Sequence, residues 1–350
     1  MFFSKTQIAI IWVFLFLPIL ISPANAGKYR IGYFEGGSYW TYDAAFKALQ
    51  EELIKMGWKD KIIFPENARF SPGWSKEDRK QWPAKAKELM ERKDLDAILA
   101  VGTPANKNIL AVNNNRTPLF GMCVSDAVKS GFVVSENDSG VDNYTVRIVP
   151  GRYERMFVIF HDVIGFKKLG LIYPDTPEGK NTANVLDAHK VAADKGFSII
   201  EYKTKSNEDL DECIKGVNAL IKEGIDAFFA PSMGCFDWEI CDAKKLFDTL
   251  MEHQIPTFAR QGTRDVKAGA LMGLSTYDFT ARGKLLAQRL IKILEGAKPR
   301  SLTMVDIAPP MISMNLYVAQ KIGFDPPVDL LGASDELFME ITLPENRLVK

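Results

Sequence analysis

The chain has 350 residues, with 44 Lys and Arg against 44 Asp and Glu, and 47% of its residues are hydrophobic. This length is too great for one hydrophobic core and suits two domains of about 150 residues each. The balanced charge provides no basic field for nucleic acid or an anionic membrane surface, so we expect neither as a partner.

Residues 1–26 have the pattern of a secretory signal peptide. Lys5 precedes an apolar run from Ile8 to Ile21, and small residues follow up to Ala26, after which we expect cleavage. A membrane anchor is the alternative, but the run is shorter than the ~20 residues that a spanning helix needs. No cysteine stands at the cleavage point, so a lipid anchor is not expected. The pattern therefore predicts a soluble protein of the periplasm.

The first half of the remaining chain repeats a strand, a polar or glycine-rich break and an amphipathic helix. Apolar residues recur at helical spacing at Ala45, Leu49 and Leu53, whereas residues 96–101 form the continuous apolar run of a buried parallel strand. The predicted strands are residues 29–34, 61–65, 96–101 and 118–124, and the predicted helices are 42–56 and 82–92.

The same alternation restarts after the break at Pro150 and Gly151. The predicted helices are residues 153–164, 182–195, 210–222 and 242–253, and the predicted strands are 168–173, 197–202, 227–230 and 256–259, with a polar loop at 174–181. Two successive βαβ arrays indicate an α/β fold of two Rossmann-like lobes, each a doubly wound parallel sheet. Ligands of such sheets lie outside the carboxyl ends of the strands.

The four cysteines are too few for a disulfide scaffold. We expect Cys123 and Cys213 to be buried as small apolar side chains, because they lie in a strand and a helix pattern. Cys235 and Cys241 are six residues apart, and an oxidising compartment permits a disulfide between them. The chain has only three His residues, so we expect no metal and no cofactor.

Catalytic residues are not evident in the sequence. His161, His189 and His253 fall in helical patterns rather than in loops at strand ends, so no Ser/His or Cys/His relay is indicated. The nucleophile-elbow, zinc-protease and phosphate-loop motifs do not occur. We therefore expect a binding protein, with an exported α/β enzyme as an alternative.

Several stretches carry a family resemblance when they are taken in order. They are VGTPA at 101–105, SDAV at 125–128, IPTFARQGTRDVKAGAL at 255–271, EGAKP at 295–299 and ISMN at 312–315. Together they resemble the substrate-binding proteins of ABC importers with the type I periplasmic binding protein fold, whose best understood members bind the aromatic amino acids tryptophan and tyrosine.

The resemblance implies a three-segment hinge. We expect the chain to cross between lobes near residues 141–149, near Ser275 and near residues 301–306, with a helix at 277–294 returning to the first lobe. The N-terminal lobe is then residues 27–147 plus 276–301, and the C-terminal lobe is residues 148–275 plus 302–345. Three crossings suit a hinge that closes around a ligand.

The candidate ligand residues of the N-terminal lobe lie where predicted strands end or helices begin. Backbone N–H groups at helix starts attract anionic groups, although the same residues are ordinary caps and turns. The large rings of Tyr39 and Trp40 suit stacking on a flat ligand or a cation, or else packing of the first helix. The resemblance implies an acid at Asp126 that could meet an ammonium group. The candidates are Gly37, Ser38, Tyr39, Trp40, Gly102, Thr103, Pro104, Ser125 and Asp126.

The candidates of the C-terminal lobe follow its strands. Residues 177–180 are an insertion relative to the ligand loop of the family, which weakens the correspondence there. Arg260 stands where family members commonly carry an acid, and a guanidinium favours a carboxylate or another anion, unless it faces solvent. The candidates are Asp175, Asn181, Thr182, Ser232, Met233, Arg260, Gln261 and Tyr277.

These observations predict the extracytoplasmic substrate-binding component of an ABC importer. By closing its cleft it would capture an amino acid or a related carboxylate, which the resemblance suggests is aromatic. The protein, a monomer, would then deliver this ligand to a membrane permease. The alternative is a periplasmic sensor that presents its bound state to a membrane receptor kinase or cyclase.

Overall fold

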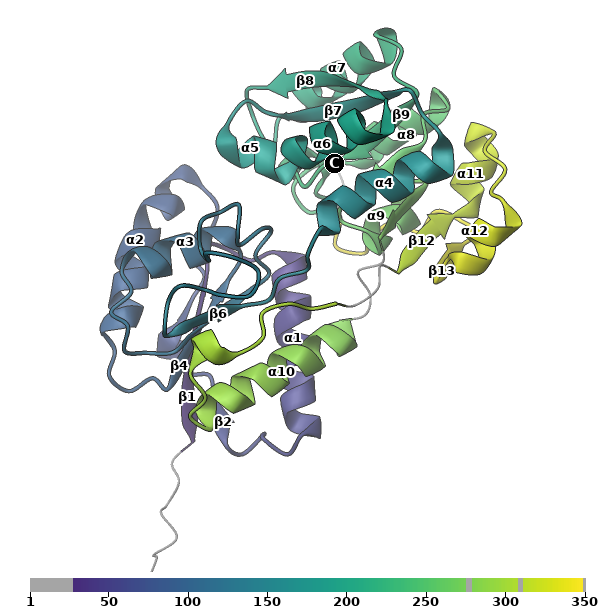
Figure 1. Cartoon of the computed structure of the whole chain (residues 1–350). Coiled ribbons are helices and arrows are strands. Elements are labelled where there is room, and N and C mark those ends of the chain that lie inside the picture. The colour runs from purple at the N-terminus through teal and green to yellow at the C-terminus, as the bar shows by residue number, and fades with distance from the viewer. Residues whose placement is uncertain (1–27, 275–278, 308–310, 349–350) are drawn as a thin grey trace, which may run out of the picture.

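The computed structural model describes residues 28–274, 279–307 and 311–348, and it shows two lobes that each carry one sheet between helices (Figure 1). The predicted α/β fold with two doubly wound lobes is confirmed. The predicted signal peptide, Ser275 and Tyr277 lie outside the described residues.

The N-terminal sheet has the strand order β2-β1-β4-β5-β6, with β3 beside β1, and its pairs are all parallel. Side chains alternate between its faces: Ile31 and Tyr33 of β1 enter one buried cluster, and Phe34 enters the other. The strands are β1 (Tyr29–Glu35), β2 (Ile62–Ile63), β3 (Arg69–Phe70), β4 (Ala97–Val101), β5 (Leu119–Met122) and β6 (Tyr144–Val146).

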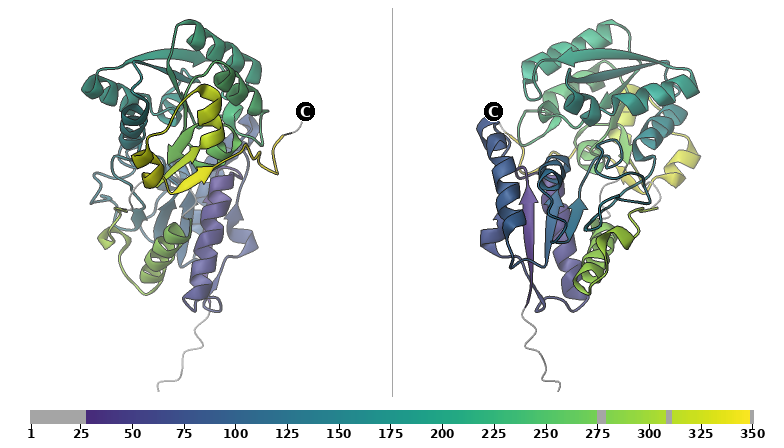
Figure 2. Two further views of the ribbon diagram at one scale, coloured as in Figure 1. Left: turned by 90° about the vertical axis from the view of Figure 1, so that its right-hand side faces the viewer. Right: turned by 60° about the vertical axis from the view of Figure 1, so that its left-hand side comes forward.

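Helices cover both faces of this sheet. On one face α1 (Trp40–Lys55) packs beside α10 (Phe279–Leu294), which returns from far along the chain (Figures 1 and 2). The two helices approach closely at Gly283, where a Cβ atom would lie 2.6 Å from the carbonyl oxygen of Ala48. The other face is covered by α2 (Lys76–Glu91) and α3 (Thr103–Ala111).

The C-terminal sheet has the order β13-β12-β11-β10-β9-β7-β8. Its pairs are parallel except for β11 with β12, which departs from the prediction of purely parallel lobes. The reason is the path of the chain: β11 leads out towards the other lobe and β12 comes back from it, so the two strands run in opposite directions. The strands are β7 (Lys168–Pro174), β8 (Ser198–Thr204), β9 (Ala227–Ala230), β10 (Thr257–Ala259), β11 (Met272–Leu274), β12 (Ile312–Asn315) and β13 (Glu336–Phe338).

Helices also cover both faces of the second sheet, with α4 and α6 on one face and α7 and α8 on the other. The insertion predicted to be a loop forms a short helix, α5, because Thr176 caps it by accepting a hydrogen bond from the Gly179 N–H (3.0 Å) and proline occupies its first position. The helices are α4 (Arg152–Ile164), α5 (Pro177–Thr182), α6 (Val185–Lys195), α7 (Leu210–Lys222), α8 (Lys244–Glu252), α9 (Thr263–Ala268), α11 (Leu316–Ile322) and α12 (Val328–Ala333).

Two segments that pass between the lobes lie side by side. One joins β6 to α4, and the other follows the 3₁₀ helix η3 (Pro299–Ser301) towards β12. Ile148 and Val305 form a parallel bridge, in which the Ile148 N–H donates to the Met304 carbonyl (2.9 Å) and the Asp306 N–H donates to the Ile148 carbonyl (2.8 Å). These two crossing segments are therefore expected to bend together. The residues at which each lobe begins and ends stay a prediction.

The disulfide of the structure joins Cys213 to Cys235, with their Cα atoms 6.6 Å apart, so the predicted Cys235–Cys241 bridge is wrong. Cys213 is buried as expected, but it is not a free thiol. It lies on the inner face of α7, against the 3₁₀ helix η2 (Gly234–Phe236) that holds Cys235. The Cys241 thiol instead donates to the Glu208 carbonyl (3.2 Å). Short spacing in sequence favoured the wrong partner, because α7 brings a cysteine 22 residues away into reach.

In the part of the chain that the structure describes, no helix combines the length and apolar character needed to cross a membrane.

Candidate ligand-binding cleft

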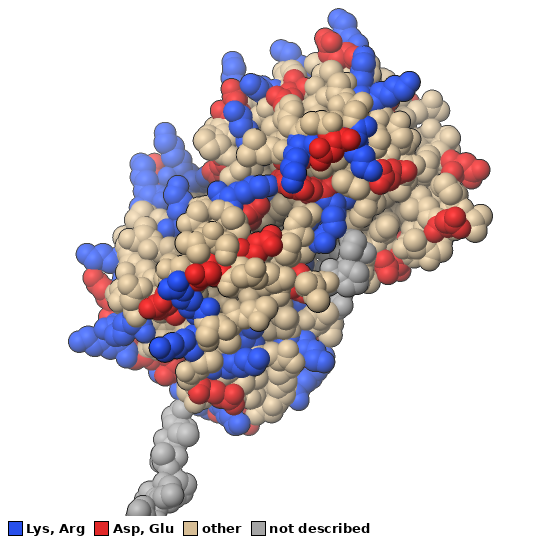
Figure 3. Space-filling model, in the orientation of Figure 1, with Lys and Arg blue, Asp and Glu red and all other residues tan. Residues whose placement is uncertain are grey.

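A cleft of 860 Å³ lies between the two lobes. Its lining comes from the loops that follow β1, β4 and β5 of one sheet and β7, β9 and β10 of the other. The carboxyl ends of parallel strands meet at one edge of a sheet, and here the two edges face each other. The volume falls in the range of small-molecule sites. In the space-filling view, acidic and basic side chains both occur along the boundary between the lobes (Figure 3).

Most of the candidate ligand residues line this one cleft. The sequence identified these positions only as loops at strand ends, and the structure brings the loops of both lobes around a common space. The lining candidates are Ser38, Tyr39, Trp40, Thr103, Pro104, Ser125, Asp126, Asn181, Thr182, Ser232, Met233, Arg260 and Gln261.

Three candidates lie outside the cleft lining. A Cβ atom on Gly37 would lie 2.8 Å from the ring of Trp74, and one on Gly102, whose φ is +85°, would lie 2.1 Å from the Tyr42 hydroxyl. Both glycines therefore serve the close packing of aromatic rings that themselves reach the cleft. Asp175 is exposed and forms ion pairs with Lys180 (3.7 Å) and Lys203.

The N-terminal lobe contributes an aromatic wall, made of Tyr39, Trp40, Tyr42 and Trp74. The rings of Tyr39 and Tyr42 meet edge to face with centroids 5.2 Å apart, and Trp74 lies 6.4 Å from Tyr42. The Trp74 indole donates to the Ser38 carbonyl (2.9 Å), which fixes the loop before α1. The rings thus pack on one another and also line the cleft. Sequence reasoning missed Trp74, which no strand-end pattern marks.

Two polar groups join the lobes directly at Tyr39. Its hydroxyl donates to the Gln261 side-chain oxygen and lies 3.4 Å from the Ser232 hydroxyl, both on the opposite lobe. Burial raises the pKa of Tyr39 to about 12, although the hydrogen bond with Ser232 acts in the other direction. The hydroxyl therefore keeps its proton at neutral pH and remains a donor across the cleft.

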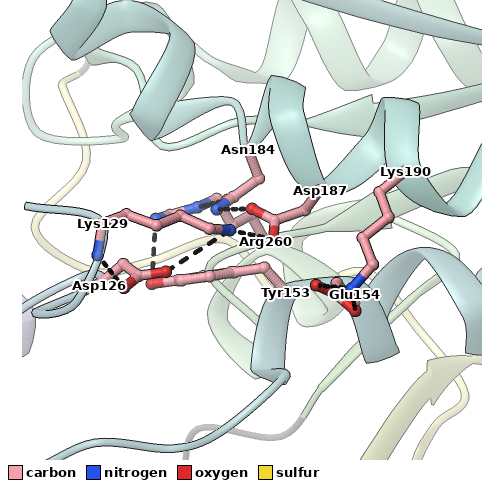
Figure 4. A network of polar contacts seen from close by, with 8 residues as sticks. All are labelled: Asp126, Lys129, Tyr153, Glu154, Asn184, Asp187, Lys190 and Arg260. Carbon is pink, nitrogen blue, oxygen red and sulfur yellow. Dashed lines mark hydrogen bonds and ion pairs between the residues drawn. The ribbon is translucent and has the colours of Figure 1, made fainter. Parts of the chain in front are cut away.

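An ion pair also spans the cleft (Figure 4). Lys129, in the loop after β5, reaches Asp187 on α6 with a Nζ–Oδ1 distance of 2.5 Å, and it lies 3.6 Å from Asp126 of its own lobe. Burial lowers the pKa of Lys129, but the Asp187 and Asp126 carboxylates together outweigh it and the net pKa is raised. Asp126, which the resemblance suggested for a ligand ammonium, thus contacts an ammonium of the protein.

Two weaker contacts join the lobes as well. Arg79 of α2 lies 3.7 Å from Glu178 of α5, and the Arg264 guanidinium lies 5.2 Å from the ring centroid of Trp40. We refer to the pairs Tyr39–Gln261, Lys129–Asp187, Arg79–Glu178 and Arg264–Trp40 as the cross-lobe contacts. They close the two lobes on each other at several points.

Arg260 is directed into the cleft by neutral partners. Its Nε donates to the Asn184 side-chain oxygen (2.6 Å), its Nη2 donates to the Tyr153 hydroxyl (3.2 Å), and its guanidinium lies 4.8 Å from the Tyr153 ring centroid (Figure 4). These contacts fix the orientation of the guanidinium but supply no negative charge.

Three further arginines, Arg147, Arg152 and Arg282, line the cleft beside the segments that pass between the lobes, and we call them the arginine cluster. Arg147 pairs with Asp306 (2.6 Å). The side chains of Arg152 and Arg282 form no hydrogen bond or ion pair with another described residue, and the Nε of Arg282 is buried. Burial lowers the pKa of Arg282 to about 10, with repulsion from Arg147 contributing, and burial likewise lowers the pKa of Arg152.

Sequence reasoning missed the arginine cluster. Two of its members lie near the Pro150–Gly151 break, and the third lies in the first turn of α10. At such positions the sequence suggests a side chain that is exposed to solvent. Among the described residues, no group of three or more His, Cys, Asp or Glu side chains is arranged to hold a metal ion.

Comparisons with known proteins agree with this architecture. The family model described as ABC transporter substrate binding protein matches residues 38–337. No curated protein matches the chain.

Solved structures share the fold at low sequence identity. An ABC domain from Streptococcus pneumonia in complex with L-Trp has a TM-score of 0.70 at 17% identity, covering 89% of this chain and 100% of that one. A conserved domain protein from Vibrio cholerae has a TM-score of 0.68 at 19% identity, covering 89% and 99%. A ligand-free, open substrate binding protein with adhesive properties from Clostridium difficile has a TM-score of 0.63 at 20% identity, covering 89% and 100%. At these identities the likeness supports the fold.

Proposed function

We propose, from the premise that this chain belongs to the ABC transporter substrate binding protein family, that it is the extracytoplasmic solute-binding component of an importer. The observation that carries the proposal is the cleft, whose lining comes from strand-end loops of two separate sheets. A ligand there touches both lobes only when they are closed, so binding shifts the population towards the closed form. The closed form would then dock on a membrane permease as a monomer.

Closure is supported by the way the lobes are joined. The paired crossing segments at Ile148 and Val305 are short and hydrogen-bonded to each other, as suits a hinge. The cross-lobe contacts are side-chain contacts that a rotation about this hinge would break and remake. Capture and release can therefore occur without disturbing either buried core.

The ligand class that we propose is an aromatic amino acid or a related carboxylate. The aromatic wall offers rings such as those of Trp40 and Tyr39 for stacking, and Arg260 offers a guanidinium for a carboxylate. The streptococcal structure with the same fold is a complex with L-Trp.

A location outside the cytoplasm is part of the proposal. The signal-peptide pattern of residues 1–26 supports it, and so does the Cys213–Cys235 disulfide, because disulfides persist mainly in oxidising compartments.

The test begins with the purified protein, denatured so that any bound small molecule is released and identified by mass spectrometry. The identified compound, and aromatic amino acids and carboxylates in parallel, should raise the melting temperature, since a ligand at one hundred times its Kd stabilises the native state by about 2.7 kcal/mol. Trp40→Ala should reduce the shift, while Tyr317→Ala, an aromatic truncation on α11 outside the cleft, should not. Absence of any released or stabilising compound, or chemical turnover of the ligand, would contradict the proposal.

A further inference from the structure

We infer that the ligand carries net negative charge, and that its anionic group is held between Arg152 and Arg282 of the arginine cluster. This inference rests on the proposed function, since it specifies the chemical class of the solute that binds in the cleft between the lobes. The inference therefore favours an anion over the zwitterion of an amino acid: a carboxylate without an ammonium group, or a phosphate ester.

The geometry starts from where the arginines stand. Arg147 and Arg152 flank the first crossing segment, and Arg282 lies in the first turn of α10, so parts of both lobes supply the cluster. Asp306 compensates the charge of Arg147 (2.6 Å). Within the described ranges, Arg152 and Arg282 form no ion pair with an acid, although both line the cleft. Two guanidinium groups therefore face the same space without an acid in direct contact, although Asp306 acts on Arg282 from a longer distance.

Uncompensated guanidinium groups are unfavourable in a partly buried site. The cost of removing a charge from water is recovered only through good ion pairs and hydrogen bonds. The Nε of Arg282 is buried and has no acceptor, and burial together with the neighbouring arginines disfavours the charged form and lowers the pKa of Arg282 to about 10. An anion between Arg152 and Arg282 would supply acceptors and charge at once.

The helix behind Arg152 favours an anion as well. Arg152 is the first residue of α4, a helix of 13 residues that begins after Gly151. The unpaired N–H groups and the dipole of a helix give its N-terminus a positive potential. Arg260, held by Asn184 and Tyr153 next to this helix, adds a third cation without an acid partner.

A ligand ammonium would find few acids available in this cleft. Asp126 and Asp187 both contact Lys129, and Glu239 pairs with Arg264 (3.0 Å). Glu178 lies 3.7 Å from Arg79. The remaining lining acids, Glu208 and Asp237, belong to loops around η2, and the charge of Asp237 acts on Tyr39. A zwitterion would leave the positive charge of the cluster unchanged, whereas an anion would reduce it.

The experiment uses four probes, three of which share one ring: phenyl phosphate, phenylpyruvate, L-phenylalanine, and inorganic phosphate. Calorimetric titration of the mature protein at pH 7.5 should give tighter binding for phenyl phosphate and phenylpyruvate than for L-phenylalanine. Arg152→Gln and Arg282→Gln should each weaken binding of the anionic probes at least tenfold. Arg116→Gln, the same change at an exposed arginine outside the cleft, is the matched control and should leave binding unchanged.

A second readout separates ligand binding from folding. Without ligand, the two glutamine variants should melt at or above the temperature of the unsubstituted protein, because each removes an uncompensated charge. Melting well below that temperature would show that the empty cleft needs these arginines, and it would overturn the inference.

The remaining outcomes distinguish the inference from the proposed function. Binding of L-phenylalanine as tight as that of phenyl phosphate, unchanged in the glutamine variants, would overturn the anion site and leave solute capture standing. Failure of every anionic probe, phosphate included, would also overturn the anion site. Solute capture itself would be contradicted if the purified protein released no small molecule and none stabilised it, or if the protein turned the ligand over.

Discussion

The cross-lobe contacts and the arginine cluster line the same cleft, but only the first set is complete without a ligand. Lys129 meets Asp187, and Tyr39 meets Gln261, whereas Arg152 and Arg282 meet no acid among the described residues. The first set holds the closed lobes together, and the second opposes closure through repulsion of like charges. A ligand of the proposed anionic class would therefore not have to supply all of the closing free energy, because it would relieve the repulsion within the arginine cluster.

The largest effect is expected when the arginine cluster loses the acid that neutralises part of its positive charge. Asp306→Asn leaves Arg147 without its acid, and removing one partner of a mostly buried ion pair costs about 3 kcal/mol in the free energy of unfolding. Urea denaturation followed by circular dichroism measures the change. Asp138→Asn breaks an exposed pair with Arg300 and should cost much less, because water screens the pair. Equal losses of unfolding free energy in the two variants would show that the pair in the arginine cluster contributes no more than an exposed pair.

A smaller effect is expected from the cross-lobe contacts. Lys129→Met removes the ion pair with Asp187, which we value at about 1 kcal/mol, so the ratio of closed to open molecules should fall about fivefold. Energy transfer between dyes placed on the two lobes reports this ratio. Lys107→Met is the control, since Lys107 lines the cleft but forms no ion pair with another described residue. A similar ratio in both variants would show that the contact does not hold the lobes.

The smallest effect concerns Tyr39. Tyr39→Phe removes the hydrogen bonds to Gln261 and Ser232 and should lower the closed-to-open ratio about twofold, equivalent to about 0.5 kcal/mol. The raised pKa of about 12 keeps the hydroxyl protonated, so this loss should be constant from pH 5 to 9.

The same pKa fixes the sign of an alkaline effect. Between about pH 10, where an unfolded tyrosine ionises, and pH 12, the native state holds a proton that the unfolded state has lost. Stability should therefore fall with rising pH in this window, and more steeply in the unsubstituted protein than in Tyr39→Phe. Parallel denaturation curves of both proteins at pH 9 and 11 would show whether the difference exists.

Periodicity and strand ends were sufficient for the fold and for much of the cleft. The helix at 210–222 and the strand at 227–230 have the bounds that the sequence predicted, because one shows a clear amphipathic pattern and the other a short apolar run. Ser232 and Gln261 line the cleft because residues after parallel strands meet at one edge of the sheet.

The rest depended on contacts between distant segments. Cys213 pairs with Cys235 because α7 packs against η2, and no spacing rule anticipates that contact. Arg282 reaches the cleft only because α10 returns to the N-terminal lobe beside the crossing segments. The antiparallel pairing of β12 likewise follows from a detour of the chain through the other lobe. Local patterns cannot specify such contacts.

The Cys213–Cys235 disulfide links the stiffness of one cleft wall to the redox state of the compartment in which the chain matures. The bridge tethers the loop that carries Ser232 and Met233 to α7, which belongs to the core of its lobe. In a reducing cytosol the two thiols would stay separate, and that wall would be held by packing alone. Protein produced there would fold into both lobes yet present a looser binding surface than the exported, oxidised form.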